Sequence, residues 1–127
     1  MRYGKFLPDG GIIGFVAPSF GCATSPYREA FDNALRKWKN MGYSLKEGPN
    51  CRASDGTGIS AAPQKCAAEL MDFYLSDQND CLISCGGGEL MCEILEYLDF
   101  EALGAAPPKW YMGYSDNTHF THLLATL

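Results

Sequence analysis

Basic residues are few in this sequence and long apolar runs are missing, and both shortages limit what the chain can bind. Ten lysines and arginines stand against fifteen aspartates and glutamates, which gives a formal net charge of −5. Such a chain lacks the positive charge that attracts nucleic acid or an anionic membrane surface. No stretch approaches the roughly 20 apolar residues that span a bilayer, and the N-terminal segment does not read as a secretory signal. We therefore expect a cytoplasmic protein that binds neither nucleic acid nor membrane.

Motifs that bind nucleotide cofactors are also absent. The sequence contains neither Gly-x-Gly-x-x-Gly nor a phosphate-binding loop, so we expect no cofactor. His119 and His122 lie three residues apart in a helical pattern, which permits metal binding only if a third ligand comes from elsewhere. We expect no metal site, and we place both histidines in the core or on the surface.

The six cysteines do not form the pattern of a zinc site or a disulfide framework. There is no Cys-x-x-Cys pair, and Cys81 and Cys85 would lie roughly 13 Å apart in an extended strand. Cys66 and Cys92 fall on what we predict to be apolar helix faces. This placement is typical of buried free thiols in cytoplasmic proteins.

What the sequence does contain is an alternation of apolar runs and helical patterns. Strands are predicted at 12–17, 43–47, 80–85 and 110–114, helices at 27–41 and 62–75, and two further helices begin near Glu89 and at Ser115. No hairpin signal separates the strands. The pattern predicts an α/β fold with an open, mostly parallel sheet and helices on both faces, either flavodoxin-like or similar to class I glutamine amidotransferases.

Three consecutive glycines, Gly86, Gly87 and Gly88, follow the third predicted strand, and a helical pattern begins at once. Glycine allows a sharp turn there and brings backbone N–H groups close to a bound ligand. Ligands of open α/β sheets bind beyond the carboxyl ends of the strands. We therefore expect the site to consist of the loops 17–26, 48–60, 86–89 and 115–117, with the glycine turn as a candidate oxyanion hole.

Taken together, these loops carry a resemblance to a known family. The matching segments are 14–19 (Gly-Phe-Val-Ala-Pro-Ser), Gly87-Gly88 with 94–100 downstream, and 108–116 (Pro-Lys-Trp-Tyr-Met-Gly-Tyr-Ser-Asp). Their order and spacing resemble those of the LD-carboxypeptidase family, which includes the microcin C immunity carboxypeptidases.

The resemblance implies a two-domain serine hydrolase that cleaves an amide next to a free carboxylate. Substrates of the family are murein tetrapeptides or aminoacyl-nucleotide antibiotics, and members are commonly homodimers. Residues 1–127 would be the N-terminal α/β domain, with a sheet that is incomplete at the C-terminus, and the Glu and His of the triad would come from a C-terminal domain. The pocket residues that the resemblance implies are Ser19, Gly87, Gly88, Ser115 and Asp116.

The chain departs from the family pattern at the nucleophile. An ungapped alignment between Gly87-Gly88 and 97–99 places the family's serine at Met91. A thioether cannot be deprotonated and cannot form an acyl-enzyme. The helical pattern places Met91 on an apolar face, so we interpret it as a core residue. Cys92 is the remaining candidate for a displaced nucleophile, although nothing in the sequence activates it.

Several candidate residues have a structural interpretation beside the functional one. The glycines either present amides to an anion or only provide a tight turn. Glu89 opens the third predicted helix, where a carboxylate interacts favourably with the helix dipole, and it would also project toward the cleft. Ser19, Ser115 and Asp116 are good N-caps as well as pocket residues.

We therefore predict an LD-carboxypeptidase-like hydrolase that acts on a small peptide or an aminoacyl nucleotide. The 127-residue chain alone should be inactive, because it has Met91 at the nucleophile position and no second domain. One alternative is a binding homologue that keeps the pocket without hydrolysis. Another is an anion- or nucleotide-binding module that uses the glycine turn.

Overall fold

A computed structural model describes residues 2–127. The elements in chain order are β1 (Ile12–Val16), α1 (Tyr27–Asn40), β2 (Ser44–Glu47), α2 (Pro63–Leu75), β3 (Cys81–Ser84), the 3-10 helix η1 (Met91–Tyr97), α3 (Phe100–Ala105), β4 (Trp110–Met112), the 3-10 helix η2 (Ser115–Asn117) and α4 (Thr118–Thr126). Across these residues, no helix combines the length and the apolar character that crossing a membrane requires.

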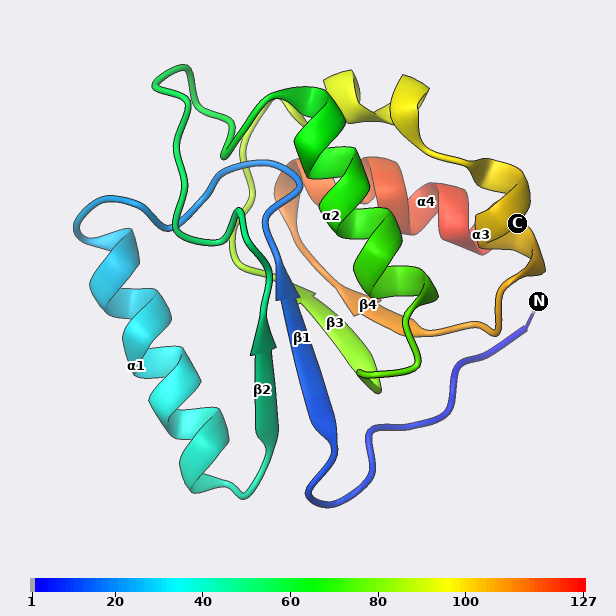
Figure 1. Ribbon diagram of the computed structural model, residues 1–127, viewed down its shortest axis with the longest axis horizontal. Helices are drawn as coiled ribbons and strands as arrows, with labels where there is room; N and C mark the ends of the chain where they lie inside the picture. The colour runs from blue at the N-terminus through cyan, green and yellow to red at the C-terminus, as the bar shows by residue number, and fades with distance from the viewer. Residues whose placement is uncertain (1) are drawn as a thin grey trace.

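The four strands form one parallel sheet in the order β2-β1-β3-β4 (Figure 1). The two central strands have the most apolar sequences, Ile-Ile-Gly-Phe-Val in β1 and Cys-Leu-Ile-Ser in β3. Such continuous apolar runs are typical of parallel strands that are covered on both faces. The predicted α/β fold is therefore confirmed, and all four strands end at the same edge of the sheet.

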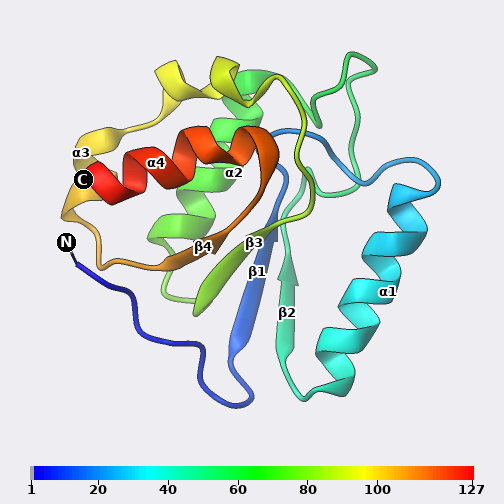
Figure 2. The same ribbon diagram turned by 180° about the vertical axis from the view of Figure 1, so that it is seen from behind.

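Helices lie on both faces of the sheet, as the sequence predicts (Figure 2). Helix α1 packs on one face, where Phe31 meets Phe15 of β1 with ring centroids 5.7 Å apart. Helices α2, α3 and α4 share a second cluster on the other face, in which Phe120 of α4 contacts Tyr74 of α2. These two clusters form the core of the structure.

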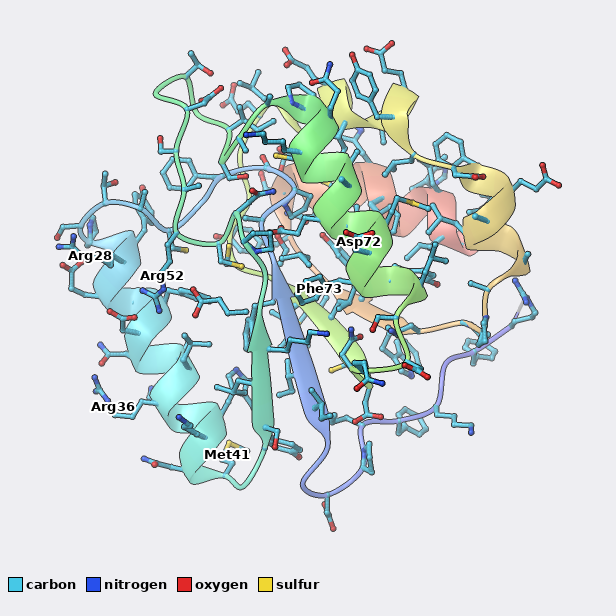
Figure 3. All side chains as sticks on the ribbon, in the orientation of Figure 1. Arg28, Arg36, Met41, Arg52, Asp72 and Phe73 are labelled. Carbon is cyan, nitrogen blue, oxygen red and sulfur yellow. The ribbon has the colours of Figure 1, made fainter. Side chains whose placement is uncertain are left out.

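Arg52 ties the loop after β2 to helix α1. Its guanidinium lies 2.8 Å from Asp32, pairs with Glu47, and stands 5.2 Å above the ring of Phe31. Figure 3 labels Arg52 in this position beside α1. The only arginine of this loop is thus engaged with side chains of α1 and β2.

The segment after the glycine turn is where the structure differs most from the sequence-based prediction. No α-helix begins near Glu89; instead η1 spans Met91–Tyr97, and a separate helix α3 follows at Phe100–Ala105. In a 3-10 helix, residues three apart lie on the same face, and Met91 and Ile94 are the buried pair. Asp99 then caps α3, because its side chain accepts a hydrogen bond from the Ala102 N–H at 2.9 Å. The spacing of apolar residues that predicted an α-helix is equally compatible with a 3-10 helix.

Candidate functional site

The loops at the carboxyl ends of the strands are joined by backbone hydrogen bonds. The Phe20 N–H donates to the Gly87 carbonyl at 3.1 Å, which joins the loop after β1 to the glycine turn. The Ser60 N–H donates to the Ser19 carbonyl at 2.8 Å, which joins the same loop to the one after β2. The Ser19 hydroxyl donates to Asp116 Oδ2, which joins the loop before α4 to the loop after β1. The four loops thus lie together at one edge of the sheet, and their role as a ligand site stays a prediction.

A cavity of about 270 Å³ opens beside the glycine turn. Its lining residues are Phe20, Cys22, Tyr27, Cys85, Gly86, Gly87, Gly88, Tyr114 and Ser115. No lysine or arginine contributes to this lining. The lining therefore offers no cationic side chain to a negatively charged ligand group.

Backbone donors are concentrated along the glycine turn. Among residues 2–127, the N–H groups of positions 86–90 donate to no other residue, whereas the flanking N–H groups of Cys85 and Met91 are both hydrogen-bonded. Successive free N–H groups in a turn form a concave site that suits an anion or a developing oxyanion. The glycine turn therefore has backbone donors that are unpaired within residues 2–127, and its role as an oxyanion hole stays a prediction.

Glycine is needed in this turn for close approach rather than for an unusual backbone angle. None of the three glycines has a positive φ. A Cβ on Gly88 would instead collide with the Ser19 hydroxyl, and a Cβ on Gly87 would lie 2.8 Å from the Ser115 Cβ. The left-handed backbone conformation is found at Ser115, with φ of 58°. Sequence reasoning located the turn correctly, and the structure adds that its glycines leave room for Ser19 and Ser115.

Ser19 and Asp116 form a side-chain pair next to Gly88. Ser19 is fully buried, and its hydroxyl donates to Asp116 Oδ2. The same carboxylate oxygen accepts the Met91 N–H at 3.1 Å. Asp116 Oδ1 is buried and has no hydrogen-bond partner among the described residues. Asp116 therefore holds the loop after β1 and the start of η1 together, with one acceptor unused.

The predicted N-cap roles of these residues are wrong. Helix α1 begins eight positions after Ser19, and its N-cap Pro26 makes no side-chain cap bond. No side chain caps η2 or α4 either, where Ser115 and Asp116 were the expected caps. Ser115 lines the cavity, and Asp116 bonds across to Ser19. Because η2 lies between β4 and α4, the Ser115 side chain faces the glycine turn and the Asp116 side chain faces the loop after β1.

Met91 is fully buried and belongs to the core cluster beneath α2, as predicted. Cys92 is exposed, which corrects the expectation that it lies on an apolar helix face. Glu89 is exposed as well, but it precedes η1, whose N-cap is Leu90, and it does not line the cavity. The proposed capping role of Glu89 is therefore wrong, because the helix that it was expected to open begins later and is of another type.

The thiols that line the cavity are poor nucleophile candidates. A hydrogen bond with Cys85, together with burial, raises the pKa of Cys22. The pKa of Cys85 is also raised: its contact with Cys22 lowers it, but the contact with Cys51 and burial outweigh that effect. A thiol with a raised pKa is protonated at neutral pH and reacts slowly. His119 and His122 are exposed, and among residues 2–127 no three potential metal ligands come together.

Sequence reasoning missed Glu69, a buried carboxylate of α2. One oxygen accepts the Ala17 N–H and the other accepts the Asn50 N–H, both at 2.6 Å. Burial raises the pKa of Glu69, and the two N–H donors only partly oppose that shift. Glu69 thus joins the loops after β1 and β2. The available signal was a glutamate on the helical face that also carries Cys66, Leu70 and Phe73.

With this fold and site established, the chain can be placed among known proteins. The peptidase S66 model, described as the LD-carboxypeptidase N-terminal domain, matches residues 13–127. The chain belongs to the LD-carboxypeptidase family. A Vibrio cholerae protein that is named as a candidate carboxypeptidase is 34% identical over 119 residues, which are 93% of this chain and 34% of that protein.

Solved structures support the same placement. MccF in complex with glutamyl sulfamoyl guanosine is 26% identical with a TM-score of 0.84, over 94% of this chain and 35% of that one. The microcin C7 self-immunity protein MccF in its apo state is 27% identical with a TM-score of 0.83 and the same coverage. An MccF-like protein from Bacillus anthracis str. Ames, 21% identical over 99% of this chain and 37% of that chain, shares the fold with a TM-score of 0.85. The chain spans about a third of the length of these relatives.

Proposed function

We propose that this chain forms one wall of the ligand site of an LD-carboxypeptidase-family protein. In this proposal the wall binds a small molecule that carries an amide next to a carboxylate, such as a murein peptide or an aminoacyl nucleotide. The observation that carries the proposal is a cavity of about 270 Å³ lined by Gly86, Gly87 and Gly88, whose N–H groups donate to no other described residue. These donors suit a carboxylate or the oxyanion of a tetrahedral intermediate.

The relatives indicate which ligand class to test first. Structures of MccF have been determined with glutamyl sulfamoyl guanosine and with aspartyl sulfamoyl adenosine. Both compounds join an amino acid to a nucleoside through a sulfamoyl group, so they offer the glycine turn a compact polar group. We propose the same class of ligand for this chain. The homodimer, the cytoplasmic location and the second domain stay predictions.

In our proposal this wall binds the ligand but does not supply the nucleophile. Met91 stands where the family has its serine, and it is fully buried with its N–H bonded to Asp116. A buried thioether cannot attack a carbonyl carbon. The backbone around Met91 still shapes the site, because Asp116 ties it to Ser19 and so to the glycine turn.

Calorimetry with aspartyl sulfamoyl adenosine tests the binding proposal. We expect the 127-residue chain to bind the compound, and Gly88→Ala to weaken binding about tenfold or more, the equivalent of one lost hydrogen bond. Gly104→Ala is the matched control, because a Cβ at Gly104 in α3 meets nothing closer than 4.0 Å. Absence of binding by the unmodified chain, or equal binding by the Gly88→Ala variant, would contradict the proposal.

A second candidate function is hydrolysis, which is favoured by the carboxypeptidase name of the Vibrio cholerae relative and by the exposed thiol of Cys92 next to Met91. Release of D-alanine from a murein tetrapeptide measures it, and we expect none. Turnover that disappears in Cys92→Ala would replace the binding proposal with a thiol hydrolase. Stabilisation by inorganic phosphate alone, without binding of the aminoacyl compound, would instead favour a simple anion-binding module.

A further inference from the structure

The carbonyl group of Gly86 is held by two buried side chains. The Ser84 hydroxyl donates to it at 2.8 Å, and Asn117 Nδ2 donates to it at 2.9 Å. Ser84 is 7% exposed and Asn117 is fully buried. Two donors on one carbonyl, both shielded from water, restrict rotation of the peptide plane between Gly86 and Gly87.

All hydrogen-bonding groups of the Asn117 side chain have a partner. The second hydrogen of Nδ2 goes to the Tyr114 carbonyl at 3.0 Å, and Oδ1 accepts the Tyr111 hydroxyl. Both partners of Nδ2 are carbonyl oxygens, so only one orientation of the amide satisfies the network. Gly113 makes room for it, since a Cβ there would lie 2.6 Å from the Asn117 Cβ. The side chain is therefore fixed in position and in orientation.

The geometry of the peptide bond transmits this constraint to the glycine turn. In a planar trans peptide, the C=O of one residue and the N–H of the next point in opposite directions. The Gly86 C=O points into the buried network, so the Gly87 N–H points away from it. The Gly87 carbonyl accepts the Phe20 N–H at 3.1 Å, which orients the Gly88 N–H through a different partner. The two donors are thus controlled independently.

We propose that Asn117 is a positioning residue that aims the Gly87 N–H at the anionic oxygen of a ligand in the cavity. Ser84 assists it, and the Phe20 N–H does the same for Gly88. This inference rests on the proposed function, because it assumes that the glycine turn receives a carboxylate or an oxyanion. It goes further by assigning each of the two donors to a separate set of partners.

Amide NMR spectra during a titration with acetate, a small carboxylate, test the assignment. In the unmodified chain we expect saturable shifts of both the Gly87 and the Gly88 amide signals. In Asn117→Asp, an oxygen replaces Nδ2 opposite the Gly86 carbonyl, so we expect the Gly87 response to be lost while the Gly88 response persists. Gly104→Ala is the matched control, because a Cβ at Gly104 meets nothing closer than 4.0 Å and touches no residue of this network, so both responses should persist.

Ser84→Ala provides a milder variant if Asn117→Asp fails to fold. It removes one of the two donors on Gly86, and we expect a smaller Gly87 response with an unchanged Gly88 response. An unchanged Gly87 response in every folded variant would overturn the inference.

A second readout needs no ligand. A scalar coupling across the hydrogen bond from Asn117 Nδ2 to the Gly86 carbonyl carbon is expected in the unmodified chain. Absence of this coupling would overturn the inference even where acetate binds. If the coupling is present but acetate causes no shifts, the result would count against the proposed function. The hydrogen bond that orients the Gly86–Gly87 peptide would still be supported.

Discussion

Glu69 and Asp116 are two carboxylates that hold the same loop after β1, and they do so differently. Glu69 uses both oxygens, which accept the backbone N–H groups of Ala17 and Asn50, and it is 3% exposed. Asp116 uses only Oδ2, which accepts the Ser19 hydroxyl and the Met91 N–H, while Oδ1 has no partner among the described residues. Glu69 therefore uses both oxygens to hold two loops together, and we call it the loop clamp. Asp116 can still accept a hydrogen bond from one more donor.

The largest effect should come from replacing each carboxylate with its amide. In Glu69→Gln an NH₂ group must face a backbone N–H, which leaves buried donors unsatisfied and should cost about 3 kcal/mol. In Asp116→Asn the oxygen can keep both donors while the NH₂ group takes the unpartnered position, so we expect about 1 kcal/mol or less. Urea denaturation measures both values. Equal losses of unfolding free energy would show that the unpartnered Oδ1 of Asp116 does not make its replacement milder.

The glycine beside Glu69 should be the next most sensitive position. A Cβ on Gly48 would lie 2.6 Å from Glu69 Oε2 and 2.8 Å from the Phe15 carbonyl, so the clamp must shift to admit it. We expect Gly48→Ala to lower the free energy of unfolding by about 1–3 kcal/mol, as overpacking does elsewhere. Gly104→Ala in α3 is the matched control and should be neutral or slightly stabilising. A neutral Gly48→Ala would mean that the clamp is not tightly packed.

Glu69 should also make the stability of the folded protein depend on pH. Its pKa is raised in the folded state, so the folded protein holds this proton more tightly than the unfolded chain. The contribution of Glu69 is then fully present below the usual glutamate pKa of about 4.3 and declines as the pH rises through the folded pKa. The stability difference between the unmodified protein and Glu69→Gln should therefore shrink with rising pH over that window. Urea midpoints measured for both proteins across a pH series test this. A stability difference that grows with pH would mean that the folded-state pKa of Glu69 is lowered rather than raised.

The smallest effect is expected at Cys92, which is exposed and touches neither carboxylate. Cys92→Ala should change stability by less than about 0.5 kcal/mol, as surface substitutions usually do. In the unmodified protein, iodoacetamide should alkylate Cys92 well before the buried Cys22 and Cys51. Mass spectrometry of the labelled peptides provides the measurement. Faster labelling of Cys22 would show that the loops held by the two carboxylates open readily.

Much of the architecture could be predicted from local pattern. The predicted strand at 12–17 and the predicted helix at 27–41 agree with β1 and α1 to within one residue at each end. The third helix could not be predicted in this way. Met91 and Ile94 are three residues apart, and that spacing is compatible with an α-helix and with a 3-10 helix alike.

The site was predicted in part. The loops that form it follow from strand order, because parallel strands end at one edge. The partners within it do not follow, since Ser19 and Asp116 are 97 residues apart and Glu69 lies 52 residues from Ala17. Nothing in the local sequence around Ser19 or Asn117 indicates that either side chain bonds across to another loop.

The alternation of strands and helices and the place of the glycine turn follow from the amino-acid sequence alone. These properties depend on side-chain chemistry and on short-range periodicity. It is the packing of distant segments that makes Glu69 a loop clamp, leaves one oxygen of Asp116 unused and places Asn117 against the Gly86 carbonyl. Buried polar groups must find hydrogen-bond partners, and which partners come within reach depends on how distant segments pack.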